Sequence, residues 1–341
     1  MENLIYTHNP QPTTHNPQPI TQNPQPKTEI MQTTNSILMI RPVAFRMNEQ
    51  TAVNNYYQKV LDGLSPETVN QKAQQEFDSF VEKLRKVGID VTVVDDTIEP
   101  STPDSIFPNN WISFHADGDV VLYPMFAENR RLERRDDILD ILEAKGFYIN
   151  DEIMDYTAAE DDGFYLEGTG SIVLDRQNSK AYCALSPRAD EELFIEFCED
   201  FDMNPVIFEA FQNVGGDRKL IYHTNVMMSV GITFAVICAD CIDDKKERKM
   251  VLDSLKADEK EIILISEDQM NNFAGNMLEV VGADERRYLV MSAAANKALT
   301  KKQITQLEEH VTILSSSLDT IEACGGGSAR CMMAEVFLPK K

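Results

Sequence analysis

The sequence lacks any long apolar run, and it has little positive charge for its size. Its 341 residues include 32 lysines and arginines against 56 aspartates and glutamates, which gives a formal net charge of −24. A surface this acidic repels phosphate backbones and anionic lipid headgroups, so we expect neither nucleic acid nor a membrane as a partner. No apolar stretch reaches the length of a membrane span, and no secretory signal pattern follows Met1. A cytoplasmic protein is therefore expected.

Cysteine is also scarce. Six residues, unevenly spaced in a chain of this length, do not make a disulfide framework. Cys238 and Cys241 have the spacing of a metal or redox pair, but no second pair of ligands accompanies them. The glycine run at 325–327 does not lead from a strand into a helix, as phosphate-binding and dinucleotide-binding loops do. We expect no metal and no cofactor.

Proline-rich repeats occupy the start of the chain. Three copies of an imperfect six-residue repeat that ends in Asn-Pro-Gln-Pro lie within residues 7–26, where proline excludes helix and little apolar surface is available for burial. We expect residues 1–35 to be a disordered tail and residues 36–341 to form a single domain. The hydrophobic content of the whole chain, 43%, is sufficient for a sizeable core.

A longer repeat begins at Ser36, where strand and helix patterns recur about five times with a period of about 55 residues. Each predicted unit has a strand and its partner, then an amphipathic helix, then a short apolar strand. The predicted first strands begin near residues 37, 111, 171, 225 and 277. The predicted helices span 67–86, 131–145, 189–201, 245–255 and 301–310.

The last predicted strand follows the glycine run and has no helix after it. We expect it to begin at Cys331 and to pair with the strand at Ile37, which would bring the two ends of the domain together. A closed ring of α/β units, a propeller with its helices outside, satisfies this pattern without an exposed sheet edge. An open mixed sheet is the alternative.

Polar residues stand at the openings of the predicted first strands. In chain order they are Asn109 and Asn110, Glu167, His223 and Asn225, Asn276, and Cys331. Taken singly, each also fits a structural role in a core or a turn. Units repeated by rotation place equivalent positions at one end of the axis, so we expect these side chains to converge. Because side chains alternate along a strand, His223 and Asn225 should face the same side.

The convergent set has a chemical meaning. A cysteine nucleophile, a histidine acid/base and a carboxylate partner are the groups that acyl-type substitution at a resonance-stabilised carbon requires. With these residues, the sequence from Ser36 onward resembles the guanidino-group-modifying enzymes, the pentein superfamily of arginine deiminases, dimethylarginine hydrolases and amidinotransferases. The matching segments are 107–110 against F-x-R-D, 166–168 against E-G-G-D, 186–188 against S-x-R, 223–225 against H-x-D, and the glycine-rich run into Cys331.

The resemblance implies a fold and a set of roles. The fold is an α/β propeller of five blades with pseudo-fivefold symmetry. The roles are Cys331 as nucleophile, His223 as general acid/base, Glu167 as its carboxylate partner, and Arg188 as a contact for a substrate carboxylate.

Two departures from the family pattern bear on the substrate. In the arginine-using members, the aspartates of F-x-R-D and H-x-D hold a cationic guanidinium, whereas Asn110 and Asn225 stand at those positions here. Two buried carboxylates facing a neutral ligand would be costly, but an amide both donates and accepts, which suits a neutral ureido group. The sequence is thus most similar to the citrulline-hydrolase branch.

We therefore expect a cofactor-independent hydrolase that converts citrulline to ornithine, carbon dioxide and ammonia through a covalent adduct on Cys331. Its partner would be a small-molecule substrate, citrulline or a related amino acid, and the sequence leaves a homodimer open. The alternatives are an arginine deiminase, another guanidino hydrolase or an amidinotransferase. A further alternative is a non-catalytic binding module, the role that this fold has in a ribosome-associated initiation factor.

Overall fold

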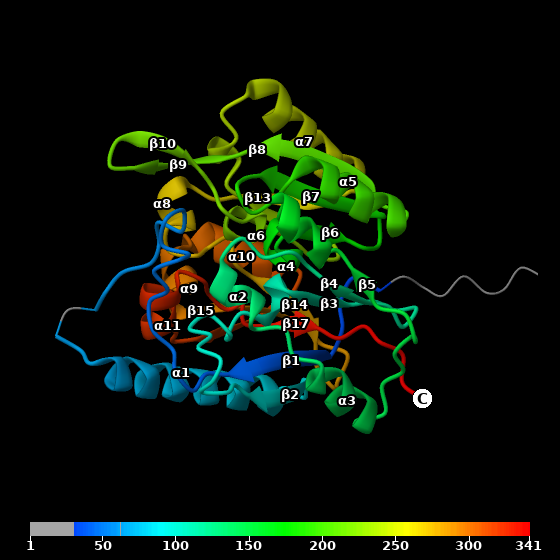
Figure 1. The fold of residues 1–341 in the computed structure, drawn as a ribbon. Helices are drawn as coiled ribbons and strands as arrows, with labels where there is room; N and C mark the ends of the chain where they lie inside the picture. The colour runs from blue at the N-terminus through cyan, green and yellow to red at the C-terminus, as the bar shows by residue number, and fades with distance from the viewer. Residues whose placement is uncertain (1–30, 62) are drawn as a thin grey trace, which may run out of the picture.

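The computed structural model describes residues 31–61 and 63–341, and within them strands and helices follow the predicted order of units. Figure 1 shows α1 (Pro66–Lys86) along one edge of the molecule and α5 (Glu191–Asp200) and α7 (Lys245–Ala257) along the opposite edge, with strands between them. No helix in this described part of the chain is long and apolar enough to cross a membrane.

Five three-stranded sheets share one topology, in which the middle strand has an antiparallel neighbour on one side and a parallel neighbour on the other. A parallel neighbour requires a crossover connection, which the helices supply. The sheets are β17 (Ala334–Glu335), β1 (Ser36–Arg41) and β2 (Asp90–Asp95); β3 (Ile112–Phe114), β4 (Val120–Leu122) and β5 (Met154–Asp155); β6 (Ile172–Asp175), β7 (Lys180–Leu185) and β8 (Asn204–Glu209); β11 (Met228–Val230), β12 (Phe234–Ile237) and β13 (Glu261–Leu264); and β14 (Leu278–Val281), β15 (Arg287–Ser292) and β16 (Thr312–Ser316).

The last strand completes the first sheet, as the sequence predicts. β17 pairs antiparallel with β1, with Glu335 opposite Ile37 and Ala334 opposite Leu38. The antiparallel outer strands of neighbouring sheets lie in contact, β17 against β3, β6 against β11, and β11 against β14. Within residues 31–61 and 63–341 no strand pairing joins one of these sheets to the next. The fold is mixed α/β, and the closed five-bladed ring stays a prediction.

The long helices are stabilised by their caps and by one apolar face. α1 begins after Ser65, whose side chain accepts a hydrogen bond from the backbone N–H of Thr68, and Pro66 occupies its first turn. Asp190 and Asp244 cap α5 and α7 in the same way. The buried face of α1 packs into the core beside β1 and β2 through Val69, Ala73, Phe77, Phe80, Val81 and Leu84. Burying each of the larger side chains stabilises the fold by about 1.5–3 kcal/mol.

The helix predicted over 131–145 is instead two helices, α2 (Glu128–Arg131) and α3 (Asp137–Ala144). Arg130 at the end of α2 and Glu133 just after it form a buried ion pair, so both side chains turn into the interior rather than toward solvent. Apolar spacing alone does not reveal an inward-facing arginine. Several short elements were also not predicted: η1 (Pro108–Asn110), η2 (Thr157–Asp162), α4 (Gly168–Ser171), β9 (Phe211–Val214), β10 (Asp217–Leu220), α6 (Thr224–Met227), η3 (Ala239–Cys241), α8 (Glu267–Met270), α9 (Ala293–Ala298) and α11 (Asp319–Gly325). The remaining helix is α10 (Lys301–Glu308).

Most of the predicted tail, residues 1–30, lies outside the described residues. Just before the predicted boundary at residue 35, Gln32 and Thr34 are buried. The Gln32 side-chain amide donates to Leu174 O at 2.9 Å, and this bond compensates its burial. Such long-range partners cannot be inferred from local composition, and the boundary between tail and domain stays a prediction.

The polar residues expected at strand openings lie instead on short turns that precede the strands. The turns are η1 before β3, α4 before β6, α6 before β11, and turns at 271–275 and 329–332 before β14 and β17. A helical turn has a period of 3.6 residues, so the alternation argument for His223 and Asn225 does not hold. His223 is the N-cap of α6 and Asn225 lies within it.

Glycine lets these turns approach one another closely. A Cβ atom added to Gly275 would lie 2.3 Å from Val226 O in α6, and one added to Gly170 would lie 2.3 Å from Asn110 Nδ2. Both distances are far inside van der Waals contact, so neither position accepts a side chain without movement of its neighbour. The gathering of polar groups at this end of the molecule therefore depends on bare glycine.

We expect Gly275→Ala to lower the free energy of unfolding by about 2–3 kcal/mol, because the new methyl group meets backbone that cannot yield. Gly215→Ala is the control: its φ of +62° costs about 1 kcal/mol, but nothing lies within 4 Å of the added atom. Urea unfolding followed by circular dichroism measures both. Equal losses in the two variants would show that the close approach of the turns at Gly275 is not under steric constraint.

Candidate active site

One narrow cavity is lined by residues from several of the turns. Cys331, His223 and Asn110 share its wall with Arg188, and Asn55 lies over it from the segment between β1 and α1. The space open to a water-sized sphere is about 10 Å³, roughly the room that one water molecule needs. The cavity is therefore too small for an amino acid in this conformation.

His223 and Glu167 form a buried pair, with 2.7 Å between Nε2 of the imidazole and Oε2 of the carboxylate. Burial raises the pKa of Glu167, but Arg188, His223 and Arg130 more than offset this effect, and its pKa falls well below the usual range. Burial lowers the pKa of His223 to about 4, against the raising effect of Glu167. At neutral pH, Nε2–H thus donates to an ionised carboxylate, and Nδ1 is the nitrogen that can accept a proton.

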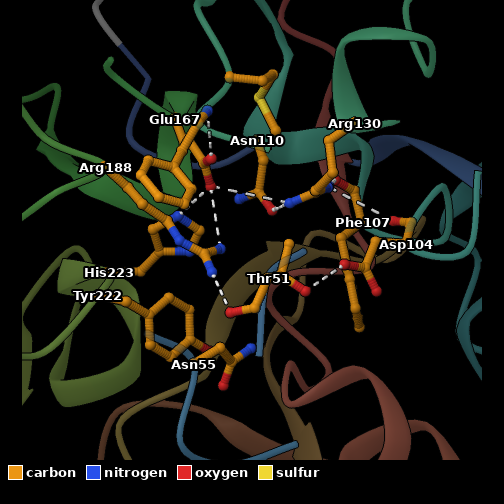
Figure 2. A network of polar contacts seen from close by, with 12 residues as sticks. Thr51, Asn55, Asp104, Phe107, Asn110, Arg130, Glu167, Arg188, Tyr222 and His223 are labelled. Atoms are coloured by element: carbon orange, nitrogen blue, oxygen red, sulfur yellow. Dashed lines mark hydrogen bonds and ion pairs between the residues drawn. The ribbon is translucent and has the colours of Figure 1, made fainter. Parts of the chain in front are cut away.

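The Glu167 carboxylate is held from several sides. Its Oε1 accepts a hydrogen bond of 3.0 Å from the Phe126 N–H, and its Oε2 lies 3.4 Å from Arg188 Nη1 and 3.9 Å from Arg130 Nη1. Figure 2 shows the carboxylate facing both guanidinium groups and the imidazole. This neighbourhood fixes the orientation of His223 and keeps its partner ionised.

Cys331 lies in the turn at 329–332, three residues before β17, rather than at the opening of that strand as predicted. Its N–H donates to Ser328 O at 3.0 Å, which fixes the turn. Its sulfur lies 3.2 Å from Asn276 Nδ2 and 3.7 Å from Asn225 Oδ1. The thiol is buried but borders the cavity, so a ligand there would meet it directly.

Asn110 presents its amide nitrogen as an unpaired donor. Arg130 Nη1 donates to Asn110 Oδ1 at 2.8 Å, and the guanidinium is itself fixed by two bonds of 2.9 Å to Glu133. Because the amide oxygen faces Arg130, the amide nitrogen faces away from it, and in the described part of the chain Nδ2 is buried without a partner. A buried donor left in this state costs about 1–3 kcal/mol, which an acceptor atom on a ligand would recover.

Asn225 lies behind the sulfur, where the protein itself uses both ends of its amide. Nδ2 donates to Thr169 O at 3.1 Å, and Oδ1 accepts from Asn276 Nδ2 at 3.2 Å. This position differs from the predicted one, facing a substrate beside His223. The difference arises because Asn225 belongs to a helical turn and not to a strand.

Arg188, the predicted contact for a substrate carboxylate, borders the cavity, but the segment between β1 and α1 occupies its donors. Nη2 donates to Thr51 O at 3.0 Å and Nε donates to Asn54 Oδ1 at 2.9 Å. Asn55 continues this cover by donating to Gly325 O at 3.3 Å. A substrate carboxylate would reach Arg188 only by replacing the oxygen atoms of this segment.

Asp104 and Arg130 also line the cavity, and the sequence analysis assigned them no role. Asp104 Oδ2 accepts from Asn48 and Thr51, whereas Oδ1 is buried and has no hydrogen-bond partner among the described residues. Burial raises the pKa of Asp104 despite the nearby Arg130. The partners that fix Asp104, Asn48 and Thr51, are more than fifty residues away in the sequence. Nothing in one sequence marks Arg130 as buried among exposed arginines.

The described residues contain no group of three or more His, Cys, Asp or Glu side chains placed to hold a metal ion. Cys238 and Cys241 are buried with their sulfur atoms 2.9 Å apart, and neither borders the cavity.

Comparison with known proteins gives one family and several solved folds. The family model for N,N dimethylarginine dimethylhydrolase, eukaryotic, matches residues 41–338. Among curated proteins, none matches the sequence significantly. Among solved structures, the chain is similar to ArgZ, an arginine dihydrolase from the ornithine-ammonia cycle in cyanobacteria, with 16% identity and a TM-score of 0.68 over 90% of this chain and 41% of that one.

Two further solved structures give the same result. Unliganded AgrE has 17% identity and a TM-score of 0.67, over 90% of this chain and 40% of its own. A dimethylarginine dimethylaminohydrolase variant, solved as an adduct with S-methyl-L-thiocitrulline, has 13% identity and a TM-score of 0.59, over 88% of this chain and 98% of its own. The chain thus spans about two fifths of the length of ArgZ and AgrE. At these identities the likeness shows the fold.

The neutral burial of His223 predicts a pH-dependent loss of stability. The unfolded chain protonates this residue near pH 6.5, whereas the folded protein keeps it neutral down to about pH 4. Between these values the unfolded state binds more protons, so acid lowers the free energy of unfolding. Between pH 7.5 and pH 5 we expect wild type to lose about 2 kcal/mol more than His223→Asn, which cannot be protonated. Urea titrations at the two pH values measure this, and parallel losses in both proteins would contradict it.

Proposed function

The chain belongs to the N,N-dimethylarginine dimethylhydrolase family of the guanidino-modifying pentein superfamily, and from this premise we propose that it hydrolyses the ureido C–N bond of citrulline. The products would be ornithine, carbon dioxide and ammonia. Cys331 is the proposed nucleophile, His223 the acid/base and Glu167 its carboxylate partner. Named relatives of similar fold include an arginine dihydrolase and a dimethylarginine dimethylaminohydrolase, both of which act on guanidino compounds.

The observation that carries the choice of citrulline is the orientation of the Asn110 amide. With Oδ1 bound by Arg130, only the N–H groups of Nδ2 are directed away from the ion pair. A ureido group has a carbonyl oxygen that can accept from this donor, whereas every nitrogen of a guanidinium is itself a donor. Two donors facing each other in a buried site leave both unpaired, at a cost of about 1–3 kcal/mol each. The arrangement therefore favours the neutral head group.

The resting protonation states suit attack by sulfur. Neutral His223 can accept the Cys331 proton as the thiolate adds to the ureido carbon. The imidazolium so formed is stabilised by ionised Glu167 and returns the proton to the nitrogen that leaves with ornithine. The C–N bond breaks and a carbamoyl group remains on sulfur. Water, deprotonated by His223, then releases carbamate, which decomposes to carbon dioxide and ammonia.

Residues around the cavity can pair with both the carboxylate and the ammonium group of an amino-acid substrate. Arg188 offers a guanidinium to a carboxylate, and Asp104 has an unpaired oxygen for an ammonium group. Figure 2 shows Asp104 and Phe107 on one side of the site and Glu167 and His223 on the other. Because the cavity has room for about one water molecule, we propose that the segment containing Thr51 and Asn54 moves aside to admit the substrate.

We also propose that the five sheets form a closed ring within a single domain. The shared topology of the sheets, the contacts between neighbouring outer strands and the pairing of β17 with β1 support this arrangement. A ring is the arrangement in which five equivalent turns all reach one axis, which explains how residues as distant as Asn110 and Cys331 border one cavity.

Arginine is the second candidate substrate, and Asp104 is the observation that favours it. This buried carboxylate borders the same cavity and has an oxygen without a hydrogen-bond partner in the described chain, so a cationic head group would also find a counter-ion. Transfer of the carbon group to an amine other than water, or a binding role without turnover, would use the same fold. The substrate test below separates these possibilities from the main proposal.

The direct test is a comparison of kcat/KM for citrulline and arginine on the purified protein without added metal. We expect ornithine release from citrulline with a kcat/KM at least tenfold above that for arginine, since one unpaired donor contact is worth about that factor. Cys331→Ser should abolish the reaction. A preference for arginine would transfer the assignment to guanidine hydrolysis, and no turnover of either would leave the binding role.

A substitution that replaces the Asn110 donor with an acceptor should shift the substrate preference from citrulline toward arginine. In Asn110→Asp an acceptor oxygen with negative charge replaces the unpaired donor Nδ2, so we expect the citrulline-to-arginine ratio of kcat/KM to fall by a factor of about ten or more. Asn225→Asp is the matched control: it adds the same charge behind the sulfur, where it should reduce both rates and leave the ratio within about threefold. Equal changes of the ratio in both variants would contradict a special role for Asn110.

A further inference from the structure

We propose that Asn276 is a catalytic residue that stabilises the Cys331 thiolate by hydrogen bonding, and that the backbone N–H of Arg330 fixes its amide in the orientation needed. The inference rests on Cys331 being the nucleophile, as proposed above, but not on the identity of the substrate. The sequence places Asn276 among the residues expected to converge but gives it no role, and the structure places its amide against the sulfur.

Asn276 makes direct contact with the reacting atom. Its Nδ2 lies 3.2 Å from Cys331 Sγ and also reaches the backbone oxygen of Asn225 at 3.0 Å. Asn225 Oδ1 lies 3.2 Å from the same nitrogen, so its two hydrogens are shared among three acceptors, and the sulfur competes with the two oxygens of Asn225. The side chain is fully buried, so water does not compete for these bonds.

The orientation of this amide is determined by its other end. Arg330 N–H donates to Asn276 Oδ1 at 3.0 Å, and Arg330 is the residue that precedes the nucleophile. A flipped amide would place a nitrogen opposite that N–H and an oxygen opposite the sulfur, which would leave donors unpaired and repel a thiolate. The turn at 329–332 thus provides both the sulfur and the N–H that aims a donor at it.

The sulfur has few other means of stabilisation. Its remaining close polar contact is Asn225 Oδ1 at 3.7 Å, an acceptor that can hold the thiol hydrogen but not a negative charge. Among the described residues no lysine or arginine is hydrogen-bonded to Sγ, and His223 is neutral at rest. Burial disfavours an unpaired thiolate, so a donor within hydrogen-bond distance decides how readily it forms.

The fold supplies Asn276 at this place through its neighbour. Gly275 has no side chain and packs directly on Val226 O, which brings the turn at 271–275 against α6. Asn276 then stands between α6, which contains Asn225, and the turn that contains Cys331. A structural side chain at so buried a point would be expected to be apolar, because each amide group there needs a partner.

The test is the pH profile of alkylation at Cys331, measured with iodoacetamide and quantified on the peptide that contains this residue. We expect the midpoint of the profile to rise by about one unit or more in Asn276→Ala, equivalent to roughly tenfold slower alkylation at a fixed pH below the midpoint. Asn276→Asp, which keeps the size but replaces the donor with a charged acceptor, should raise it further. The midpoint is used because slow access to the cavity changes the rate but not the midpoint.

Asn272→Ala is the matched control. Asn272 lies in the same loop and is exposed, and its side chain donates only to Asp268 O among the described residues, so loss of that side chain should leave the midpoint unchanged. If Asn276→Ala does not fold, Asn276→Asp and Asn276→Ser decide the question. Wild-type midpoints in folded variants of Asn276 would overturn the proposal and leave the residue a purely structural role.

Turnover gives a second readout. With whichever substrate proves active, the loss of kcat in Asn276→Ala should diminish as the pH rises, because more thiolate forms without the donor. A loss that is constant with pH would indicate misplacement of the sulfur and would also overturn the proposal. Failure of citrulline as a substrate leaves the alkylation result unaffected, so the two proposals fail separately.

Discussion

The hydrogen bond from Arg130 to Asn110 is the constraint on which the account of this site depends. It determines which end of one buried amide on the cavity wall faces away from the ion pair, and thereby whether a donor or an acceptor is left without a partner there. The guanidinium can do this because Glu133 holds it through two bonds in the interior. A buried ion pair of this kind adds little to stability but specifies an orientation. Here that orientation coincides with the chemical difference between a ureide and a guanidinium.

The site is assembled from five turns rather than from one element, and each turn depends on the next for its position. Glu167 orients His223, and Asn276 contacts Cys331. Asn225 links these two pairs, because its amide is hydrogen-bonded to Thr169 on one side and to Asn276 on the other. Bare glycines permit the close packing, and the charges of the two arginines and two glutamates compensate one another in the interior. Removal of one member should therefore disturb more than its own contact.

Much of the fold and part of the candidate site could be predicted from the sequence, because its strand and helix patterns repeat. The period of the apolar patterns predicted the order of strands and helices, and the equivalent openings of the units predicted that residues such as Glu167, His223 and Cys331 would meet. The prediction did not distinguish a strand opening from a helical turn, because one turn is too short to show a period. Asn225 was for that reason placed facing the substrate, whereas it lies behind the sulfur. Arg130 and Asp104 were missed because burial of a charged residue depends on partners distant in sequence.

The central claim, that Cys331 attacks a ureido carbon, is tested most directly by the mass of the enzyme during turnover. The protein is mixed with excess citrulline, quenched in acid within the first turnovers, and digested. The mass of the peptide that contains Cys331 is then measured by mass spectrometry. We predict that the mass of this peptide increases by one carbamoyl group and that one ornithine is released for each modified peptide. The increase should be absent without substrate and in a variant that lacks the His223 imidazole. An unmodified peptide with citrulline, alongside an amidino adduct with arginine, would contradict it.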